Sequence, residues 1–140
     1  MSLGVRRFWQ LIWTLTAIYW VFICIMTHLP PDKVPKPDVS DKTEHIVAYG
    51  LLTGAIYLSL WPRRWTVLKT AIVVLLIIMV YGALDEITQP IFGRSCDILD
   101  WVADVSGCAI ALTVMSLAKL AMPRSQLVED AVASSVQNES

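Results

Sequence analysis

The sequence predicts an all-α fold, an integral membrane bundle of four transmembrane helices with both termini in the cytoplasm. Of its 140 residues, 56% are hydrophobic and only 16% are charged. Long apolar stretches alternate with short polar segments. These features are typical of helices that cross a lipid bilayer. The net charge of −1 provides no strong attraction for nucleic acid, so we expect the bilayer, and no nucleic acid, as a partner.

The first predicted span covers residues 8–29, which contain no Asp, Glu, Lys or Arg. As a helix this stretch would extend about 33 Å, enough to cross the hydrocarbon core. A cleaved signal peptide is the alternative, but the apolar stretch is long and no small-x-small cleavage site follows it, so we expect a retained span. Residues 30–40 contain four prolines and are expected to form an extended loop, because proline cannot donate a backbone hydrogen bond.

The second predicted span covers residues 45–61. Asp41 fits the N-cap position before it, with Glu44 three residues later as in a capping box. Gly50 and Gly54 form a small-residue face, which suits close contact with another helix.

The third predicted span covers residues 66–89. Its most apolar part, residues 71–84, would extend only about 21 Å as a helix, too short to cross alone. The helix therefore has to continue through Asp85 and Glu86, which places these carboxylates at the membrane edge. Pro90 is expected to end it.

The fourth predicted span covers residues 98–120. We assign residues 1–122 to a single four-span membrane domain. Residues 123–140 are polar, rich in Ser and without hydrophobic periodicity, which predicts a disordered cytoplasmic tail.

The distribution of basic residues predicts the orientation. In a four-span topology, the N-terminal segment, the turn between the second and third spans and the C-terminal flank share one side. They hold seven Lys and Arg residues against four on the other side. Because short cytoplasmic loops are enriched in Lys and Arg, we expect both termini in the cytoplasm. The polar ends of three helices then meet at the outer membrane surface.

The segment between residues 81 and 107 holds five of the twelve acidic residues. They are Asp85, Glu86, Asp97, Asp100 and Asp104. The first two lie at the C-terminal end of a predicted helix, where the helix dipole disfavours negative charge. Ionisable groups held in a membrane at such a cost are candidates for function.

The other three acids lie on one face of the fourth predicted helix. Asp97 fits the N-cap position, and Asp100 lies in the first turn, where negative charge is stabilised. Asp104 lies too far along the helix to act as a cap. The spacing of three and four residues places these acids and Gly107 on one face, which we expect to point into the bundle.

Two basic side chains are expected near these acids. Arg94 is the predicted partner of the carboxylates, because a guanidinium group binds carboxylate or phosphate through two hydrogen bonds. His45 lies four residues from both Asp41 and Tyr49 on one helix face, where it can carry protons or bind a metal. A loop salt bridge and a polar helix end are the structural alternatives for these two residues.

Three segments together carry a family resemblance: DKTEHIVAY from Asp41, YGALDEITQ from Tyr81 and GRSCDILDWVADVSG from Gly93. In their order and spacing the chain resembles the VanZ-like family of small bacterial membrane proteins. The resemblance implies a multi-pass helical protein of the bacterial cell (inner) membrane. The namesake of the family is linked with resistance to the glycopeptide teicoplanin, without remodelling of the peptidoglycan precursor. Asp104 stands where the family usually has Asn, which adds a charge.

We expect a polar site at the outer membrane surface that binds or processes a cell-envelope component, either a lipid-linked phosphate or a glycopeptide-type ligand. Whether it catalyses a reaction stays open. The candidate catalytic residues are His45, Glu86 and Asp100. The candidate ligand-binding residues are Asp41, Lys42, Tyr49, Gln89, Arg94, Asp97 and Asp104. Glu86 and Asp100 offer carboxylates to a divalent cation, but they lack a recognised metal signature, so no metal ligands are assigned.

Two alternatives remain. The first is a non-enzymatic accessory or structural membrane protein, in which the acidic residues and Arg94 form an ion network that locks the helices. The second is a small transporter, which we rank last because the inner halves of the spans are nearly free of charge. The sequence contains no phosphate loop and no zinc motif, and its three cysteines lack metal-site spacing.

Overall fold

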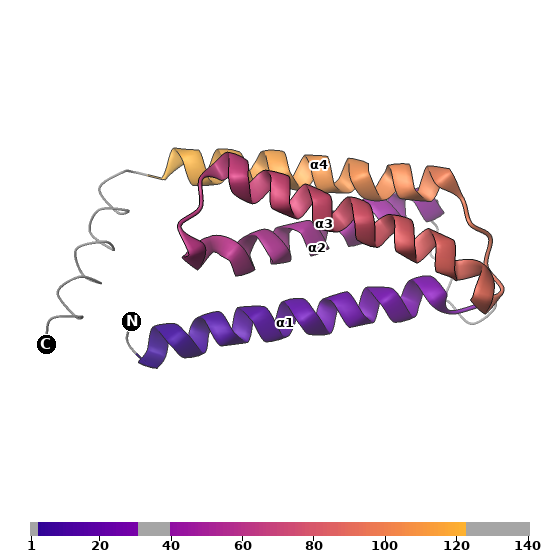
Figure 1. Cartoon of the computed structure of the whole chain (residues 1–140), viewed down its shortest axis with the longest axis horizontal. Coiled ribbons are helices and arrows are strands. Elements are labelled where there is room, and N and C mark those ends of the chain that lie inside the picture. Colours follow the sequence, from indigo (N-terminus) through magenta and orange to yellow (C-terminus); the bar gives the residue numbers. More distant parts are fainter. Residues whose placement is uncertain (1–2, 31–39, 123–140) are drawn as a thin grey trace, which may run out of the picture.

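The computed structural model of the protein describes residues 3–30 and 40–122 (Figure 1). These residues form four long helices, α1 (Leu3–His28), α2 (Asp41–Leu60), α3 (Val67–Thr88) and α4 (Ile98–Ala121). Two short 3-10 helices, η1 (Trp61–Arg63) and η2 (Gln89–Phe92), follow α2 and α3. The all-α prediction is confirmed. The predicted tail and nearly all of the predicted proline-rich loop lie outside the described residues.

Three helical segments are long and apolar enough to cross a membrane: Leu3–His28, Val67–Phe92 and Ile98–Ala121. The second predicted span is also helical, as α2, but it is not among these three. Its first turn carries the charged residues Asp41, Lys42 and Glu44. Together with polar side chains on the buried face, such as that of His45, they lower its mean hydropathy.

The N-caps of α2 and α4 were both predicted as aspartates. For α4 the prediction is confirmed, since Asp97 Oδ1 accepts a hydrogen bond from the backbone N–H of Leu99 at 2.9 Å. For α2 it is wrong, because Ser40 is the N-cap and accepts a hydrogen bond from the backbone N–H of Thr43 at 3.3 Å. Ser and Asp are about equally good N-caps, so sequence alone does not choose between adjacent candidates.

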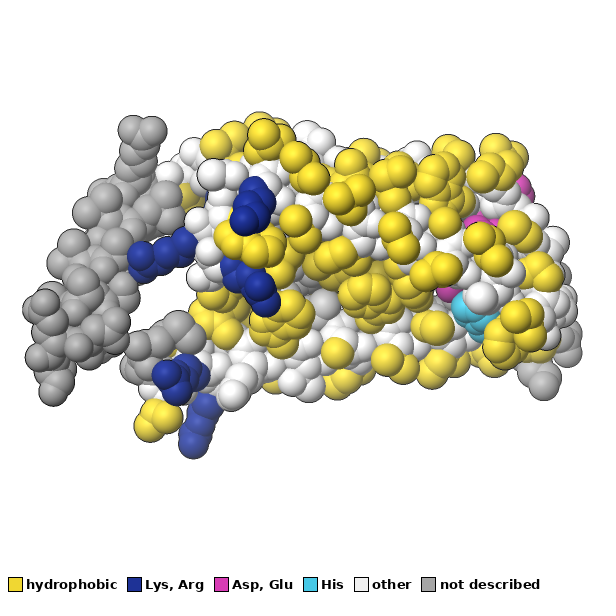
Figure 2. Space-filling view, in the orientation of Figure 1, with side chains coloured by type: hydrophobic (Ala, Val, Ile, Leu, Met, Phe, Trp, Pro, Cys, Tyr) yellow, Lys and Arg dark blue, Asp and Glu magenta, His cyan; other side chains and the backbone are white. Residues whose placement is uncertain are grey.

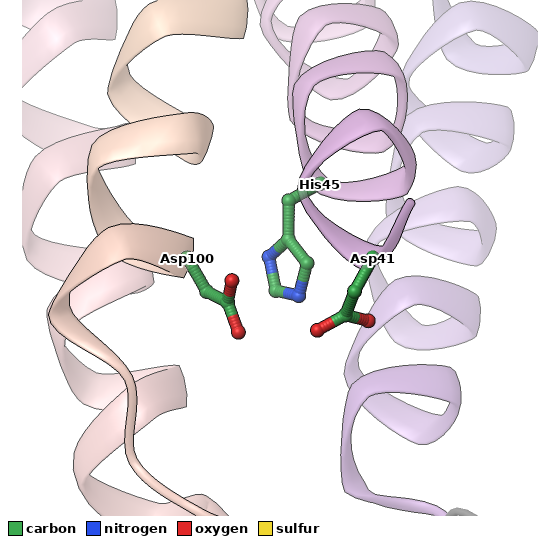
Figure 3. A group of neighbouring side chains, drawn as sticks. All are labelled: Asp41, His45 and Asp100. Atoms are coloured by element: carbon green, nitrogen blue, oxygen red, sulfur yellow. The ribbon is translucent and has the colours of Figure 1, made fainter. Parts of the chain in front are cut away.

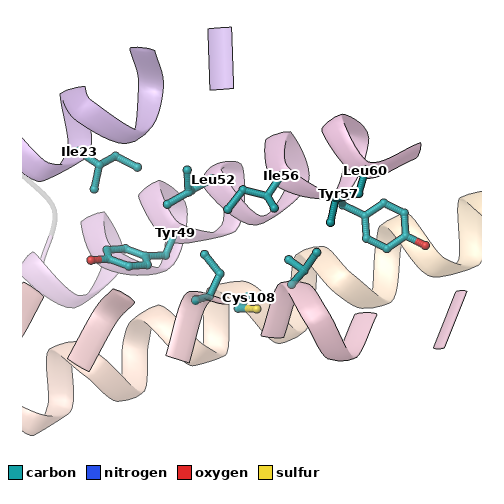
Figure 4. Close-up of a cluster of buried hydrophobic side chains, with 9 residues drawn as sticks. Ile23, Tyr49, Leu52, Ile56, Tyr57, Leu60 and Cys108 are labelled. Carbon is teal, nitrogen blue, oxygen red and sulfur yellow. The ribbon is translucent and has the colours of Figure 1, made fainter. Parts of the chain in front are cut away.

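The helices alternate in direction, so that one end of the bundle holds the start of α1, η1 and the end of α4 (Figure 1). Helix α2 lies at the centre and packs most extensively against α4. Its buried residues Tyr49, Leu52, Ile56, Tyr57 and Leu60 form the core with Ile23, Val74, Ile78 and Cys108 from the other three helices (Figure 4). Helix α1 is the least covered and buries only Thr16 and Ile23.

Helices α2 and α4 approach each other closely at two glycines. A Cβ atom at Gly50 would lie 3.3 Å from the carbonyl oxygen of Gly107, and a Cβ atom at Gly107 would collide with the carbonyl oxygen of Ile46. The prediction that Gly107 allows close helix approach is therefore confirmed. Gly54, predicted to share this role with Gly50, has no neighbouring atom within 4 Å of a Cβ position. This crossing places the residues before Ile46 beside the residues before Gly107.

The surface is divided along the long axis of the bundle. In Figure 2 hydrophobic side chains cover the middle, Lys and Arg side chains gather at one end, and Asp, Glu and His side chains appear towards the other. Large side chains such as Leu51, Leu76, Val80 and Ile110 are more than half exposed, as expected where lipid replaces water. We call the second end, formed by the C-terminal turns of α1 and α3 and the N-terminal turns of α2 and α4, the polar end.

Candidate functional site

Four carboxylates and one imidazole are buried at the polar end. The side chains belong to His45, Asp85, Glu86, Asp100 and Asp104, and each of these residues exposes 5% or less of its surface. Burying an ionisable group is costly unless it is paired or hydrogen-bonded, so the partner of each group has to be identified.

His45 and Asp104 form a buried pair between α2 and α4. His45 Nδ1 donates a hydrogen bond to Asp104 Oδ1 at 2.8 Å. The pair lies next to the close crossing at Ile46 and Gly107, which brings the two helices near enough for this contact. The other carboxylate oxygen, Asp104 Oδ2, has no hydrogen-bond partner. Helix α3 approaches it with Gly82, where a Cβ atom would lie 2.9 Å from Oδ2.

His45 belongs to two groups of side chains whose ligand atoms all lie within 4.8 Å of one another. One group combines it with Asp41 and Asp100, and Figure 3 shows the imidazole between these two carboxylates. The other group combines it with Glu86 and Asp104, all three buried. The imidazole is thus at the centre of the acidic cluster.

Lys42 is the cation that pairs with the acids of α4. Its Nζ donates to Asp97 Oδ2 at 3.0 Å and to Asp100 Oδ1 at 2.9 Å. The hydrogen bonds with Asp100 and Asp97 raise the pKa of the Lys42 ammonium group. The pKa of Asp97 is lowered by the backbone N–H of Leu99 and by Lys42.

The prediction that Arg94 pairs with these α4 acids is wrong. Its guanidinium group lies 3.7 Å from Asp41 Oδ1, and it donates a hydrogen bond of 3.5 Å to the carbonyl oxygen of Leu29. Arg94 precedes α4 in the chain, and its side chain reaches towards the ends of α1 and α2 instead of along the acidic face. It therefore lies at the rim of the cluster.

Glu86 joins the end of α3 to the beginning of α4. Its Oε2 accepts the backbone N–H of Asp97 at 2.9 Å, and its Oε1 accepts the Gln89 side-chain amide at 3.1 Å. Both donors are neutral. The carboxylate is therefore held in place without an adjacent Lys or Arg among the described residues.

Helix α1 contributes two polar residues that the sequence reasoning missed. Thr27 Oγ1 donates to Asp85 Oδ1 at 2.8 Å, and His28 Nδ1 lies 3.5 Å from the same oxygen. The Gln89 amide contacts the other oxygen of Asp85 at 3.3 Å. A signal was present, because Thr27 and His28 are adjacent polar residues at the end of an apolar stretch.

Aromatic rings extend from the acidic cluster into the bundle. The His45 and Tyr49 rings stack with centroids 6.1 Å apart, and Tyr49 stacks on Tyr81 at 5.7 Å. Tyr81 also meets the edge of Trp20 at 5.1 Å. The hydroxyl groups of Tyr49 and Tyr81 have no hydrogen-bond partner. The buried part of the site therefore contains unsatisfied polar atoms besides Asp104 Oδ2.

The structure brings all ten candidate residues to the polar end. His45, Glu86, Gln89, Asp100 and Asp104 are buried in the cluster, and Tyr49 lies beneath His45. Lys42, Asp97, Arg94 and Asp41 lie nearer the surface. Chemically, a carboxylate-bound imidazole can transfer protons, and the rim cations can bind an anion.

Comparison with known proteins identifies one family. A family model described as VanZ/LLP1 matches residues 5–119 of the chain. This range contains nearly all of the four long helices and every residue of the cluster described above. No curated protein and no solved structure matches the chain.

Proposed function

This chain belongs to the VanZ/LLP1 family, and from that premise we propose that its polar end is a site at the outer surface of the bacterial inner membrane that binds or processes a cell-envelope molecule. The ligand class is an amphiphile with a phosphate or glycopeptide headgroup, and the activity contributes to antibiotic resistance. One observation carries the proposal: four carboxylates and a histidine are buried at one end of a bundle whose sides are apolar.

For the polar end to lie at the outer surface, α2 has to cross the membrane as the fourth span. Its twenty residues extend about 30 Å, the thickness of the hydrocarbon core. The end of the bundle opposite the polar end holds the start of α1, η1, the start of α3 and the end of α4, and it therefore carries Arg6, Arg7, Arg63, Lys69 and Lys119. The preference of basic residues for the cytoplasm supports an inner position for that end and an outer position for the polar end.

The energetic cost of the cluster supports a chemical role. A buried ion pair can often be replaced by apolar side chains of similar size with no loss of stability, or with a gain of about 1–4 kcal/mol. A bundle that needed only cohesion would therefore be served as well by Leu or Met. The retained carboxylates of Asp85, Glu86, Asp100 and Asp104 are better explained by what they bind.

Within the site, the residues suit different tasks. His45, held at Nδ1 by Asp104, can use its other nitrogen either to exchange protons or to bind a metal ion. Arg94 makes only long contacts, to Asp41 Oδ1 at 3.7 Å and to the Leu29 carbonyl oxygen at 3.5 Å, so it can exchange them for an anionic headgroup. Lys42 is the second cation at the polar end, where it pairs with Asp97 and Asp100.

An apolar groove between α1 and α2 supports an amphiphilic ligand. It has a volume of about 300 Å³, and its lining is almost entirely hydrophobic. The lining residues are Ile12, Leu15, Thr16, Tyr19, Leu51, Ala55 and Leu58. Ala55 lies about 15 Å along the helix axis from His45, roughly half the hydrocarbon thickness. A hydrocarbon chain attached to a headgroup at the polar end would reach the groove.

A second candidate function has its own supporting observation. The hydrogen bonds of the polar end connect all four long helices: Thr27 joins α1 to Asp85 of α3, His45 joins α2 to Asp104 of α4, and Glu86 joins α3 to α4. An accessory membrane protein with no chemistry of its own would use such a network only to lock the helices together.

The experiment compares Glu86→Gln and Arg94→Ala in cells challenged with an envelope-targeting glycopeptide. Abundance and detergent gel filtration report folding, and Glu44→Gln is the matched control at the same end of the bundle. We expect the two site variants to fold at normal abundance and to lose resistance, while the control keeps it. If both site variants disappear or aggregate, the cluster is a helix-locking network and the proposed site is rejected.

A further inference from the structure

We propose that His45, Glu86 and Asp104 bind one divalent transition-metal ion, Mn²⁺ or Zn²⁺, at the centre of the polar end. The three residues come from α2, α3 and α4, and their ligand atoms lie within 4.8 Å of one another. One imidazole and two carboxylates form a donor set suited to these ions. The proposal deepens the proposed function and rests on it for the use to which the ion is put.

The unpartnered oxygen of Asp104 is independent evidence for a ligand. Asp104 is completely buried, and its Oδ2 accepts no hydrogen bond. This oxygen faces Gly82 of α3, and Glu86 lies one helical turn further along the same face of α3. It is therefore directed towards the helix face that supplies the second carboxylate. A metal ion between the two residues would satisfy it.

The balance of charge also favours a cation. Lys42 pairs with Asp97 and Asp100, and Arg94 contacts Asp41. In the two described segments of the chain, neither Lys nor Arg forms an ion pair with Glu86 or Asp104. Their combined charge of about −2 when ionised would be balanced by a single divalent ion.

The neighbouring groups hold the proposed ligands in position. Gln89 and the backbone N–H of Asp97 fix the Glu86 carboxylate, and Tyr49 stacks on the His45 ring. Outer contacts of this kind orient metal ligands in known sites. Three protein ligands leave a coordination position for water or for a substrate oxygen, which is the arrangement of catalytic zinc sites. An ion there would give an acidic cluster affinity for a phosphate headgroup.

A competing group, formed by Asp41, His45 and Asp100, is less suited to a metal ion. The Asp41 side chain is 54% exposed, and Asp100 is already bound by Lys42, whose positive charge opposes a cation. The two groups share His45, so only variants of the carboxylates distinguish them.

The test uses the full chain, purified in detergent without a polyhistidine tag and treated with a chelator. Calorimetric titration with Zn²⁺ and paramagnetic resonance of added Mn²⁺ measure affinity and stoichiometry. We expect one ion per chain, with affinity reduced at least about tenfold in Asp104→Asn and in Glu86→Gln, in line with the effect of disturbing groups around metal sites. The control Glu44→Gln should bind as the wild type does, and Asp100→Asn distinguishes the competing group. Gel filtration verifies that each variant is folded.

Absence of saturable binding to the folded wild-type chain would overturn the proposal, whichever variants fold. A loss of affinity in Asp100→Asn with Asp104→Asn unaffected would also overturn it, in favour of the competing group. The proposed function fails separately: if the ion binds as expected but Asp104→Asn cells keep full resistance, the metal site stands without that function. If resistance depends on Glu86 and no ion binds, the function stands without the metal.

Discussion

The crossing of α2 and α4 allows the packing of the bundle to be tested by adding one methyl group at a time. Replacement of Gly107, Gly50 or Gly54 by Ala adds the same atom at three positions that differ in their distance to the neighbouring helix. At Gly107 it would collide with the Ile46 backbone, at Gly50 it would lie 3.3 Å from a backbone oxygen, and at Gly54 it would meet nothing within 4 Å. The three substitutions should therefore change the free energy of unfolding by different amounts and in different directions.

The magnitudes follow from two opposing effects. Ala is favoured over Gly inside a helix by about 1 kcal/mol, which applies to all three positions. Overpacking costs about 1–3 kcal/mol, and the upper value applies at Gly107 because a backbone carbonyl cannot rotate away as a side chain can. The net expectation is a loss of about 2 kcal/mol for Gly107→Ala, little change for Gly50→Ala, and a gain of about 1 kcal/mol for Gly54→Ala.

Reversible unfolding in mixed micelles, followed by circular dichroism, would give the three free energies of unfolding. The Gly107→Ala variant should also lose resistance, because separation of α2 from α4 moves His45 away from Asp104. Equal stabilities for Gly107→Ala and Gly54→Ala would refute the reasoning, since the helices would then not be in contact at Gly107.

Three further predictions concern the ends of the helices and the groove. Thr27→Val removes a donor to buried Asp85 and should lower the free energy of unfolding by about 1–3 kcal/mol, measured in the same micelles. Ser40→Ala should cost about 1 kcal/mol as the loss of an N-cap, whereas Asp41→Ala should cost clearly less; the reverse order would restore Asp41 as the cap. Ala55→Trp should fill the apolar groove and reduce resistance while folding and metal affinity stay at wild-type values; unchanged resistance would show that no ligand chain enters the groove.

The helices were predictable because hydrophobic length and proline positions are local properties of the chain. The third predicted helix, residues 66–89, compares with α3 at Val67–Thr88, and the fourth, residues 98–120, with α4 at Ile98–Ala121. The shared face of Asp100 and Asp104 was predictable for the same reason, since helical spacing alone determines it. Both residues are buried, as expected for a face directed into the bundle.

The partners of these residues were not predictable, because they depend on how each helix is rotated and displaced against its neighbours. Arg94 was expected opposite the α4 acids, but Lys42 occupies that position because the first turn of α2 lies against the first turn of α4. Thr27 and His28 were overlooked because the predicted topology places the ends of α1 and α3 on the same side of the membrane but does not indicate which side chains meet there. The local sequence pattern thus predicts which residues share a helix face, whereas the residues that contact this face depend on tertiary packing.

The polar residues of α2 explain both its modest hydropathy and its contribution to the site. Helix α2 contacts each of the other three long helices, and its buried face carries His45, Tyr49, Thr53 and Ser59. These residues lower its hydropathy, and they also include the imidazole at the centre of the polar end. In a membrane protein of this size, the helix with the weakest signal for crossing the bilayer is therefore the one to search first for a functional site. The same reasoning explains why α1, which buries only two residues, gives a clear hydropathy signal and contributes only its last turn to the cluster.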